Sequence, residues 1–292
     1  MLNLPSPVQQ ITFREHKFYL KRDDLIDPFI SGNKWRKLKY TLKQANAAQK
    51  THLVTFGGAY SNHLLATAAA AARFGLQASA FVRGEEVNNP TLTLCKLYGM
   101  QLYFVDRCSY RDKEKLFEQF FKNDPNAYFV DEGGAGEEGI IGCAEIIDEL
   151  EENYQHIFCA AGTGTTAAGL LRGIQRQNLN TKLHVVPVLK GAEFIAHNIL
   201  KTTSDSSHLV MEYDYHFGGY AKTTPSLIRF IQQFCSETGV LIDPIYTGKL
   251  FYAVVDWLAH NKAEEDQKIL VIHSGGLHGI LGKLDEFWKE ST

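Results

Sequence analysis

The sequence predicts an α/β protein in which parallel strands alternate with helices. From about residue 50 onward, short apolar runs rich in β-branched residues alternate with longer amphipathic runs. Continuous apolar strands of this kind are typical of βαβ units, whose helices cover both faces of a parallel sheet. The length of 292 residues, with 45% hydrophobic and 22% charged residues, suits a globular protein of one large or two medium domains.

The elements follow this alternation along most of the chain. Strands are predicted over residues 17–21, 52–56, 78–82, 102–105, 127–130, 156–160, 183–189 and 269–272. Helices are predicted over residues 34–48, 61–74, 91–98, 109–121, 140–151 and 166–177. The segment 201–224 has neither period, and a long irregular loop in a compact α/β protein is more often functional than accidental. Tyr220 lies in this loop and is therefore a candidate to reach a site.

Charge, cysteines and histidines argue against several classes of function. A formal net charge of −3 gives no general attraction to nucleic acid or to an anionic membrane. The five cysteines include no C-x-x-C pair and the histidines no H-x-x-x-H spacing, so we expect reduced thiols and no metal. Residues 1–13 do not resemble a secretory signal, and the Ala-rich run 63–76 is too short to span a membrane. We therefore expect a cytoplasmic protein with a small-molecule partner.

A basic stretch, Ser-Gly-Asn-Lys-Trp-Arg-Lys-Leu-Lys at residues 31–39, leads into the first predicted helix. Its first three residues are turn and cap types, so Lys34 should lie in the first helical turn. The positive end of the helix dipole and the neighbours Arg36, Lys37 and Lys39 would lower the pKa of Lys34, which prepares a lysine for Schiff-base chemistry. The alternative is a solvated basic helix start that at most binds an anion.

A Gly/Thr turn follows the strand at 156–160 and opens the next helix. In the sequence Gly162-Thr163-Gly164-Thr165-Thr166, glycines expose backbone N–H groups and threonines add hydroxyls, which is the composition of a phosphate cradle at a helix N-terminus. With Ala167 the turn also matches the G-x-G-x-x-A pattern of dinucleotide sites. Such a site requires an acidic residue after the next strand, and that strand is followed by Lys190. The turn therefore fits the phosphate of a ligand without a ribose better than it fits a dinucleotide. A tight turn with no ligand is the remaining alternative.

Two further turns carry polar side chains. In residues 57–63, Gly-Gly-Ala-Tyr-Ser-Asn-His, Ser61 would cap the following helix or, with Asn62, hold a carboxylate. Tyr246, followed by Thr-Gly-Lys, is either a core phenol or a candidate acid and ring-stacking partner. Because parallel sheets bind ligands at the carboxyl ends of their strands, we expect these turns to meet. A lysine, a phosphate cradle, a carboxylate site and a tyrosine together indicate pyridoxal 5'-phosphate.

Five motifs carry a resemblance to a known family. They are SGNKWRKL at 31–38, GGAYSNH at 57–63, GTGTTAAG at 162–169, DPIYTGK at 243–249 and HSGG at 273–276. In this order they resemble the 1-aminocyclopropane-1-carboxylate deaminase/D-cysteine desulfhydrase family, over about residues 20–280. The resemblance implies a fold type II pyridoxal-phosphate enzyme: a two-domain, three-layer parallel-sheet architecture like that of the tryptophan synthase β subunit. Residues 48–140 would form a small α/β domain, residues 1–47 and 141–292 the large cofactor-binding domain, and the family suggests a homodimer.

The same resemblance implies roles for single residues. Lys34 matches the lysine that binds the cofactor aldehyde, and Lys37 would help to neutralise the phosphate. The phosphate loop would be formed by Gly162, Thr163, Gly164, Thr165 and Thr166. Asn62 matches the asparagine that bonds the ring hydroxyl of the cofactor. Ser61, Asn62 and His63 match the substrate site. Tyr246 and Tyr220 match active-site tyrosines. Arg36 and Lys39 would then be ordinary surface charges.

Two positions separate the two activities of the family. Ring-opening deaminases of this family have Glu after the tyrosine and Leu before the later Gly-Gly, whereas this chain has Thr247 and Ser274. A neutral hydroxyl facing the cofactor's ring nitrogen makes a weaker electron sink than a carboxylate would, which suits β-elimination. The expected function is thus D-cysteine desulfhydrase-like, with the cyclopropane deaminase as the alternative. A nucleotide-dependent oxidoreductase and a non-catalytic binding protein for pyridoxal phosphate or an amino acid are the rivals from other classes.

Overall fold

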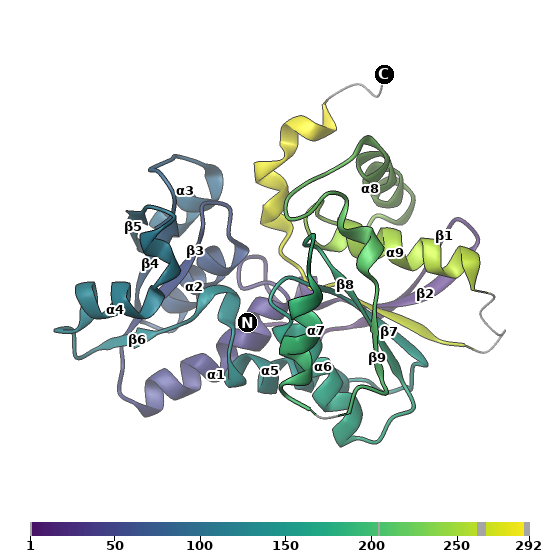
Figure 1. The fold of residues 1–292 in the computed structure, drawn as a ribbon, viewed down its shortest axis with the longest axis horizontal. Coiled ribbons are helices and arrows are strands. Elements are labelled where there is room, and N and C mark those ends of the chain that lie inside the picture. Colours follow the sequence, from purple (N-terminus) through teal and green to yellow (C-terminus); the bar gives the residue numbers. More distant parts are fainter. Residues whose placement is uncertain (1, 204, 262–266, 289–292) are drawn as a thin grey trace.

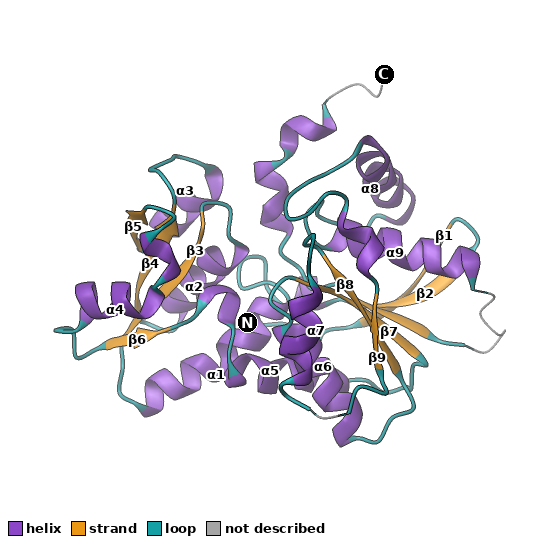
Figure 2. Cartoon of the chain, in the orientation of Figure 1, coloured by secondary structure: helices purple, strands orange, loops and turns teal. Residues whose placement is uncertain are grey.

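A computed structural model describes residues 2–203, 205–261 and 267–288 of the chain. The described residues form two lobes, each built on its own sheet, and α1 (Asn33–Ala47) runs below the smaller lobe toward the junction with the larger one (Figure 1). Helices flank the strands of both sheets (Figure 2). The predicted α/β class is therefore confirmed.

The larger sheet has six strands in the order β1-β2-β10-β7-β8-β9. All of its neighbours pair in parallel except β1 and β2, which form an antiparallel hairpin at one edge. Its strands are β1 (Val8–Phe13), β2 (His16–Lys21), β7 (His156–Ala161), β8 (Lys182–Pro187), β9 (Leu209–Met211) and β10 (Ile269–Ile272).

Alternating side chains of β7 show why this sheet is covered on both faces. Ile157 and Cys159 pack with α5 (Glu137–Asp148), α6 (Thr165–Arg176) and α7 (Glu193–Leu200). Phe158 and Ala160 point the other way, toward α8 (Pro225–Thr238) and α9 (Thr247–His260). Because successive strand residues face opposite sides, an all-apolar strand requires two helical layers.

The smaller sheet has four parallel strands in the order β5-β4-β3-β6. They are β3 (His52–Gly58), β4 (Gln77–Arg83), β5 (Gln101–Val105) and β6 (Ala127–Phe129). One face packs with α1, α2 (Asn62–Arg73) and α3 (Pro90–Leu97), and the other with α4 (Lys113–Phe121). The boundaries at residues 48 and 140 stay a prediction.

The structure adds elements that the sequence pattern did not predict: β1, β9, α7, α8 and α9. It also corrects the expectation that residues 243–249 form a turn after a strand. Residues 243–246 lie between α8 and α9, and residues 247–249 are in the first turn of α9. The described residues of the loop 201–224 are irregular as predicted, apart from β9 and a short 3-10 helix, Tyr213–His216.

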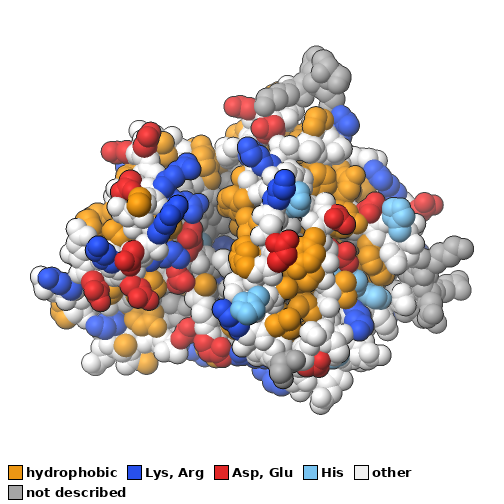
Figure 3. Space-filling view, viewed as in Figure 1, with side chains coloured by type: hydrophobic (Ala, Val, Ile, Leu, Met, Phe, Trp, Pro, Cys, Tyr) orange, Lys and Arg blue, Asp and Glu red, His pale blue; other side chains and the backbone are white. Residues whose placement is uncertain are grey.

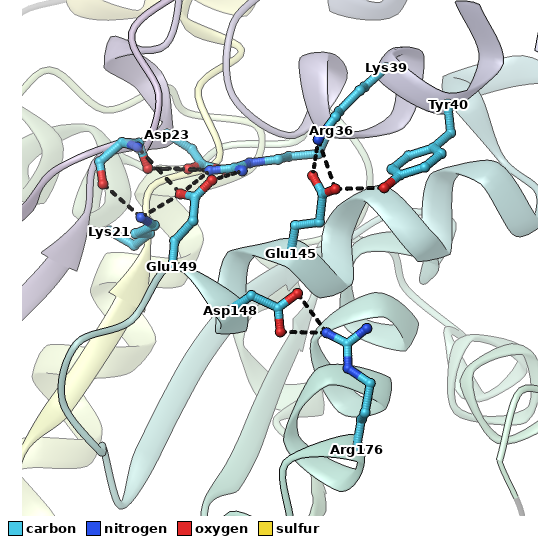
Figure 4. A network of polar contacts seen from close by, with 10 residues as sticks. Lys21, Asp23, Arg36, Lys39, Tyr40, Glu145, Asp148, Glu149 and Arg176 are labelled. Atoms are coloured by element: carbon cyan, nitrogen blue, oxygen red, sulfur yellow. Dashed lines mark hydrogen bonds and ion pairs between the residues drawn. The ribbon is translucent and has the colours of Figure 1, made fainter. Parts of the chain in front are cut away.

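Ion pairs bind α1 to the larger lobe (Figure 4). Arg36 is 1% exposed and lies between Asp23 and Glu149, so it is not the surface charge that we expected. Its Nη2 donates to Asp23 Oδ1 and Glu149 Oε2 at 2.8 Å each, and Lys21 Nζ donates to the same carboxylate oxygen of Glu149 at 2.8 Å. Lys39 is not free either, because its Nζ lies 2.6 Å from Glu145 Oε2. These contacts fix the helix that carries Lys34.

Within the described residues, no helix is both long and apolar enough to cross a membrane. In the same part of the chain, no group of three or more His, Cys, Asp or Glu side chains is arranged to hold a metal ion.

Candidate active site

A cavity of about 580 Å³ lies between the two lobes. Its lining comes from the ends of strands in both sheets and from the starts of α1, α2 and α6, where ligand sites of open parallel sheets lie. The surface is hollowed between the lobes on the face drawn in Figure 3. The predicted site residues that line the cavity are Lys34, Lys37, Ser61, Asn62, His63, Gly162, Thr163, Gly164, Thr166, Tyr220, Tyr246 and Ser274.

Lys34 lies in the first turn of α1, as predicted, and its side chain reaches the cavity. Its Nζ donates to Asn33 Oδ1 at 2.9 Å, and Asn33 Nδ2 donates to Thr166 Oγ1 at 3.0 Å, which connects the lysine to the start of α6. Burial lowers the pKa of Lys34 to about 7, and the neighbouring Lys37 contributes to the shift. The sequence predicted this direction but attributed it in part to Arg36 and Lys39, whose charges are neutralised elsewhere.

The Gly/Thr turn forms a concave start of α6. Gly164 has a φ of +90°, and a Cβ there would come within 3.3 Å of the Ile199 side chain, so glycine is required. Thr166 lines the cavity, while Thr165 pairs its hydroxyl with Thr163 at 3.1 Å and does not line it. Lys37 Nζ lies on the same side and donates to Gly133 O at 2.9 Å. Backbone N–H groups, the helix dipole and a lysine together suit a phosphate.

The turn before α2 gives the cavity a second polar wall. Ser61 caps α2 through a bond from Leu64 N at 3.4 Å, as the simpler interpretation predicted, and it also lines the cavity. Asn62 Oδ1 is buried without a hydrogen-bond partner. His63 bonds Thr55 Oγ1 at 2.8 Å, and burial together with the nearby lysines holds its pKa well below the ordinary value. His63 is therefore neutral at pH 7.

Two tyrosines close the cavity on the side of the larger lobe. The rings of Tyr220 and Tyr246 meet edge to face, with centroids 6.0 Å apart and an interplanar angle of 74°. Tyr246 lies against Gly162, where a Cβ would come 3.2 Å from the Tyr246 hydroxyl oxygen. Burial first, and then the neighbouring Tyr220, raise the pKa of Tyr246 well above its ordinary value, so this phenol keeps its proton.

Thr247 differs from the expectation. Its side chain is completely buried and does not line the cavity. Its hydroxyl donates to Asp243 Oδ1 at 2.8 Å and accepts from Asp243 N at 2.7 Å, which holds the turn before α9. Ser274 does line the cavity, so of the two predicted hydroxyls it alone reaches the site.

Several lining residues were not predicted from the sequence: Asn33, Arg83, Glu132 and Lys283. Arg83 ends β4, and the rule that ligands lie at the carboxyl ends of parallel strands could have found it. Glu132 follows β6; it pairs with Lys113 at 3.5 Å and lies 4.0 Å from Arg83. Lys283 comes from a C-terminal segment without a sequence motif, so no local signal pointed to it.

The donor set fits pyridoxal phosphate. Lys34 supplies an amine with a lowered pKa, the start of α6 with Lys37 supplies a phosphate site, and Ser274 supplies a hydroxyl. Asn62 Oδ1 is buried without a hydrogen-bond partner, and the ring hydroxyl of the cofactor would provide the missing donor. These residues surround one cavity, which is what a single bound cofactor requires.

Comparisons with known proteins agree with this fit. The family described as pyridoxal-phosphate dependent enzymes matches residues 2–275. A Pyrococcus horikoshii protein provisionally named 1-aminocyclopropane-1-carboxylate deaminase is 34% identical over 277 residues, which cover 89% of this chain and 85% of that protein. An Arabidopsis thaliana protein named bifunctional D-cysteine desulfhydrase/1-aminocyclopropane-1-carboxylate deaminase is 28% identical, covering 98% of this chain and 80% of that protein.

A solved structure described as an ACC deaminase homologue superimposes with a TM-score of 0.85 and 31% identity, covering 98% of this chain and 94% of that one. A fungal L-serine ammonia-lyase from Rhizomucor miehei shares the fold, with a TM-score of 0.75 at 16% identity. The chain therefore belongs to the pyridoxal-phosphate dependent enzymes of fold type II, in the family that resembles 1-aminocyclopropane-1-carboxylate deaminase and D-cysteine desulfhydrase.

Proposed function

We propose that this enzyme is a lyase that eliminates the β-substituent of a small D-amino acid, converting D-cysteine and water to pyruvate, sulfide and ammonia. The observation that carries the proposal is the hydroxyl of Ser274 in the cavity, at a position where the ring-opening deaminases of the resemblance have Leu. Among the described residues that line the cavity, Glu132 is the only acidic one, and it is paired with Lys113. The names of the Arabidopsis thaliana and Salmonella typhi relatives, the latter 26% identical and named D-cysteine desulfhydrase, support the same activity.

The residues of the cavity can take different roles in the reaction. Bound pyridoxal phosphate would supply an aldehyde for the substrate amine and an electron sink for the α-carbon. Lys34 would hold the cofactor, and its Nζ would accept the α-proton of the substrate. With a pKa of about 7 in the protein without ligand, much of this amine is neutral at pH 7. Ser61 and the N–H groups at the start of α2 bind the substrate carboxylate.

The two tyrosines act near the leaving group. Tyr246 keeps its proton at neutral pH because its pKa is raised, so it can donate a hydrogen bond to a departing thiolate. Tyr220 is 48% exposed at the mouth of the cavity and limits the entry of water beside Tyr246. A cytoplasmic location and a homodimer are part of the proposal; the free cysteines support the first and the family resemblance the second.

The second candidate is opening of the cyclopropane ring of 1-aminocyclopropane-1-carboxylate. It is favoured by the name of the Pyrococcus horikoshii relative. The neutral hydroxyl of Ser274, which lines the cavity, argues against it, because the weaker electron sink favours a substrate whose own leaving group takes the electrons. A non-catalytic protein that binds the cofactor or an amino acid is the alternative from another class.

A substrate screen tests the proposal. The protein loaded with pyridoxal phosphate is incubated with D-cysteine, L-cysteine, D-serine and 1-aminocyclopropane-1-carboxylate, with the Lys34→Ala variant as the control. We expect sulfide and pyruvate from D-cysteine at the highest kcat/KM. Ammonia formed fastest from the cyclopropane amino acid, without sulfide, would instead establish the second candidate. A loaded protein whose absorbance responds to none of the four would be a binding protein.

A further inference from the structure

A buried lysine outside the cavity is surrounded by backbone carbonyl groups. Lys249 lies in the first turn of α9, and its side chain is completely buried. Its Nζ donates to Gly219 O at 2.7 Å, to His216 O at 2.8 Å and to Val188 O at 3.4 Å. Burial lowers the pKa of Lys249 to about 8, which still leaves the ammonium form in the majority at pH 7. An ammonium ion in this setting is costly to bury and is retained only with good acceptors.

The carbonyl groups belong to two segments that are distant in the sequence and lie side by side, since a Cβ on Gly219 would come 3.5 Å from Lys190 Cβ. Val188 directly follows β8, and it precedes Leu189, which lines the cavity. His216 and Gly219 belong to the irregular loop 201–224. Lys249 therefore joins the carboxyl end of a central strand, the start of α9 and this loop.

The loop has an unfavourable backbone where Lys249 binds it. Phe217, Gly218, Gly219 and Ala221 all have positive φ, at +50°, +91°, +118° and +54° respectively. Positive φ costs a non-glycine residue about 1–2 kcal/mol, so this segment needs contacts from elsewhere to keep its shape. Three bonds from one ammonium ion to the surrounding carbonyl groups supply such contacts.

The segment that Lys249 holds carries Tyr220. Gly219 O accepts the shortest of the three bonds, and the next residue is Tyr220, whose ring packs edge to face on Tyr246. Tyr220 and Ala221 both line the active-site cavity. Tyr246 precedes α9 and Lys249 lies in its first turn, so one end of a helix places both tyrosines.

We propose that Lys249 is a positioning residue for the reaction, a fixed internal cation that holds residues 216–221 so that Tyr220 stays at the mouth of the cavity against Tyr246. Its relevance to turnover rests on the proposed function, whereas the effect on the loop does not. This gives the loop 201–224, and the lysine of the DPIYTGK motif, a shared role.

Hydrogen exchange of the loaded protein tests the position of the loop without any turnover. Lys249→Met keeps the length of the side chain and removes the charge; Lys268→Met, at a surface pair with Glu152, is the matched control. We expect the amides of residues 216–221 to exchange at least about tenfold faster in Lys249→Met only, with the central strands of the larger sheet unchanged. Exchange that is unchanged in the loop, or that rises equally in β7 and β8, would overturn the proposal. If Lys249→Met does not fold, Lys249→Gln, which keeps N–H donors without a charge, replaces it.

Rescue by a cation separates a fixed charge from simple packing. In Lys249→Ala the carbonyl oxygens remain, and K⁺ is a cation that backbone carbonyls coordinate. We expect potassium chloride to slow loop exchange toward the wild-type rate, and tetramethylammonium chloride at equal ionic strength to have no effect, because that ion cannot approach the carbonyls closely. Equal effects of the two salts would contradict the assignment.

A double-variant cycle tests the path through Tyr220. If Lys249 acts by placing Tyr220, then Tyr220→Ala combined with Lys249→Met should lower kcat/KM no further than the larger single loss. Additive losses would show that Lys249 acts in another way. A protein with no turnover of any amino acid would remove the proposed function and leave the exchange result standing.

Discussion

Gly32 lies directly against the main chain of Ser274. A Cβ on Gly32 would come 1.8 Å from Ser274 O, and Asn33 N donates to the same oxygen at 3.1 Å. The residue before the Lys34 helix thus touches the residue that offers its hydroxyl to the cavity, although more than 200 positions separate them in the sequence. This contact sets the position of Lys34 relative to Ser274, and it leaves no room for any side chain at Gly32.

Gly32→Ala should therefore destabilise the protein and weaken its binding of pyridoxal phosphate. Gly32 has a φ of +61°, and the new methyl group would meet a backbone carbonyl that cannot move without shifting the loop after β10. Gly75→Ala is the matched control, because Gly75 has a φ of +69° and a Cβ there would meet nothing within 4 Å. We expect only the conformational cost of about 1–2 kcal/mol for Gly75→Ala and a larger loss for Gly32→Ala, measured by urea unfolding and by cofactor titration. Equal costs in both assays would contradict the importance of the contact.

Lys34→Ala should remove the covalent attachment of the cofactor. The loaded wild-type protein should absorb visible light, and borohydride reduction should add the mass of the cofactor to the peptide that contains Lys34. Lys268→Ala, which removes an exposed lysine paired with Glu152, should leave both signals unchanged. A colourless wild-type protein, or a modified peptide that does not contain Lys34, would disprove the role of this lysine.

The rate at which the cofactor-free protein reacts with pyridoxal phosphate should depend on pH in a characteristic way. Only the neutral amine attacks an aldehyde, and burial with the nearby Lys37 lowers the pKa of Lys34 to about 7. The rate should therefore rise through pH 7 and level off about one pH unit above it. The free amine of Nα-acetyl-lysine has an unperturbed pKa of about 10.4, so its rate should still be rising at pH 9. Stopped-flow absorbance measures both, and a midpoint for the protein near that of the free amine would refute the lowered pKa.

Arg36→Met should destabilise the protein far more than the loss of a surface ion pair. Arg36 is almost fully buried between Asp23 and Glu149, and its removal leaves the buried carboxylate of Asp23 without this cation and Glu149 with Lys21 alone, a cost of about 3–5 kcal/mol. Arg176→Met removes an exposed pair with Asp148 on α5, for which we expect about 0–1 kcal/mol. Chemical unfolding of both variants compares the two free energies directly. A cost below about 1 kcal/mol for Arg36→Met would mean that the ion pairs of Arg36 contribute little to holding α1.

Much of the site could be predicted from the sequence because its chemistry is local. The cap and turn residues at 31–33 place Lys34 in a first helical turn, and the Gly/Thr turn at 162–166 opens a helix with free N–H groups; both features depend on a few neighbouring residues. The alternation of apolar strands and amphipathic helices likewise predicted the α/β class and the parallel central strands. The antiparallel strand β1 was missed because its residues carry a weak apolar pattern at an exposed edge.

What the sequence by itself determined was the set of reactive groups and the helices and turns that carry them. The tertiary structure alone decided which of these groups meet. Arg36 is a buried ion-pair partner, Thr247 binds Asp243 instead of lining the cavity, and Lys249 reaches a loop about 30 residues away. Burial and pairing depend on atoms that the fold brings together from distant parts of the chain, and such contacts leave no pattern in the residues beside them.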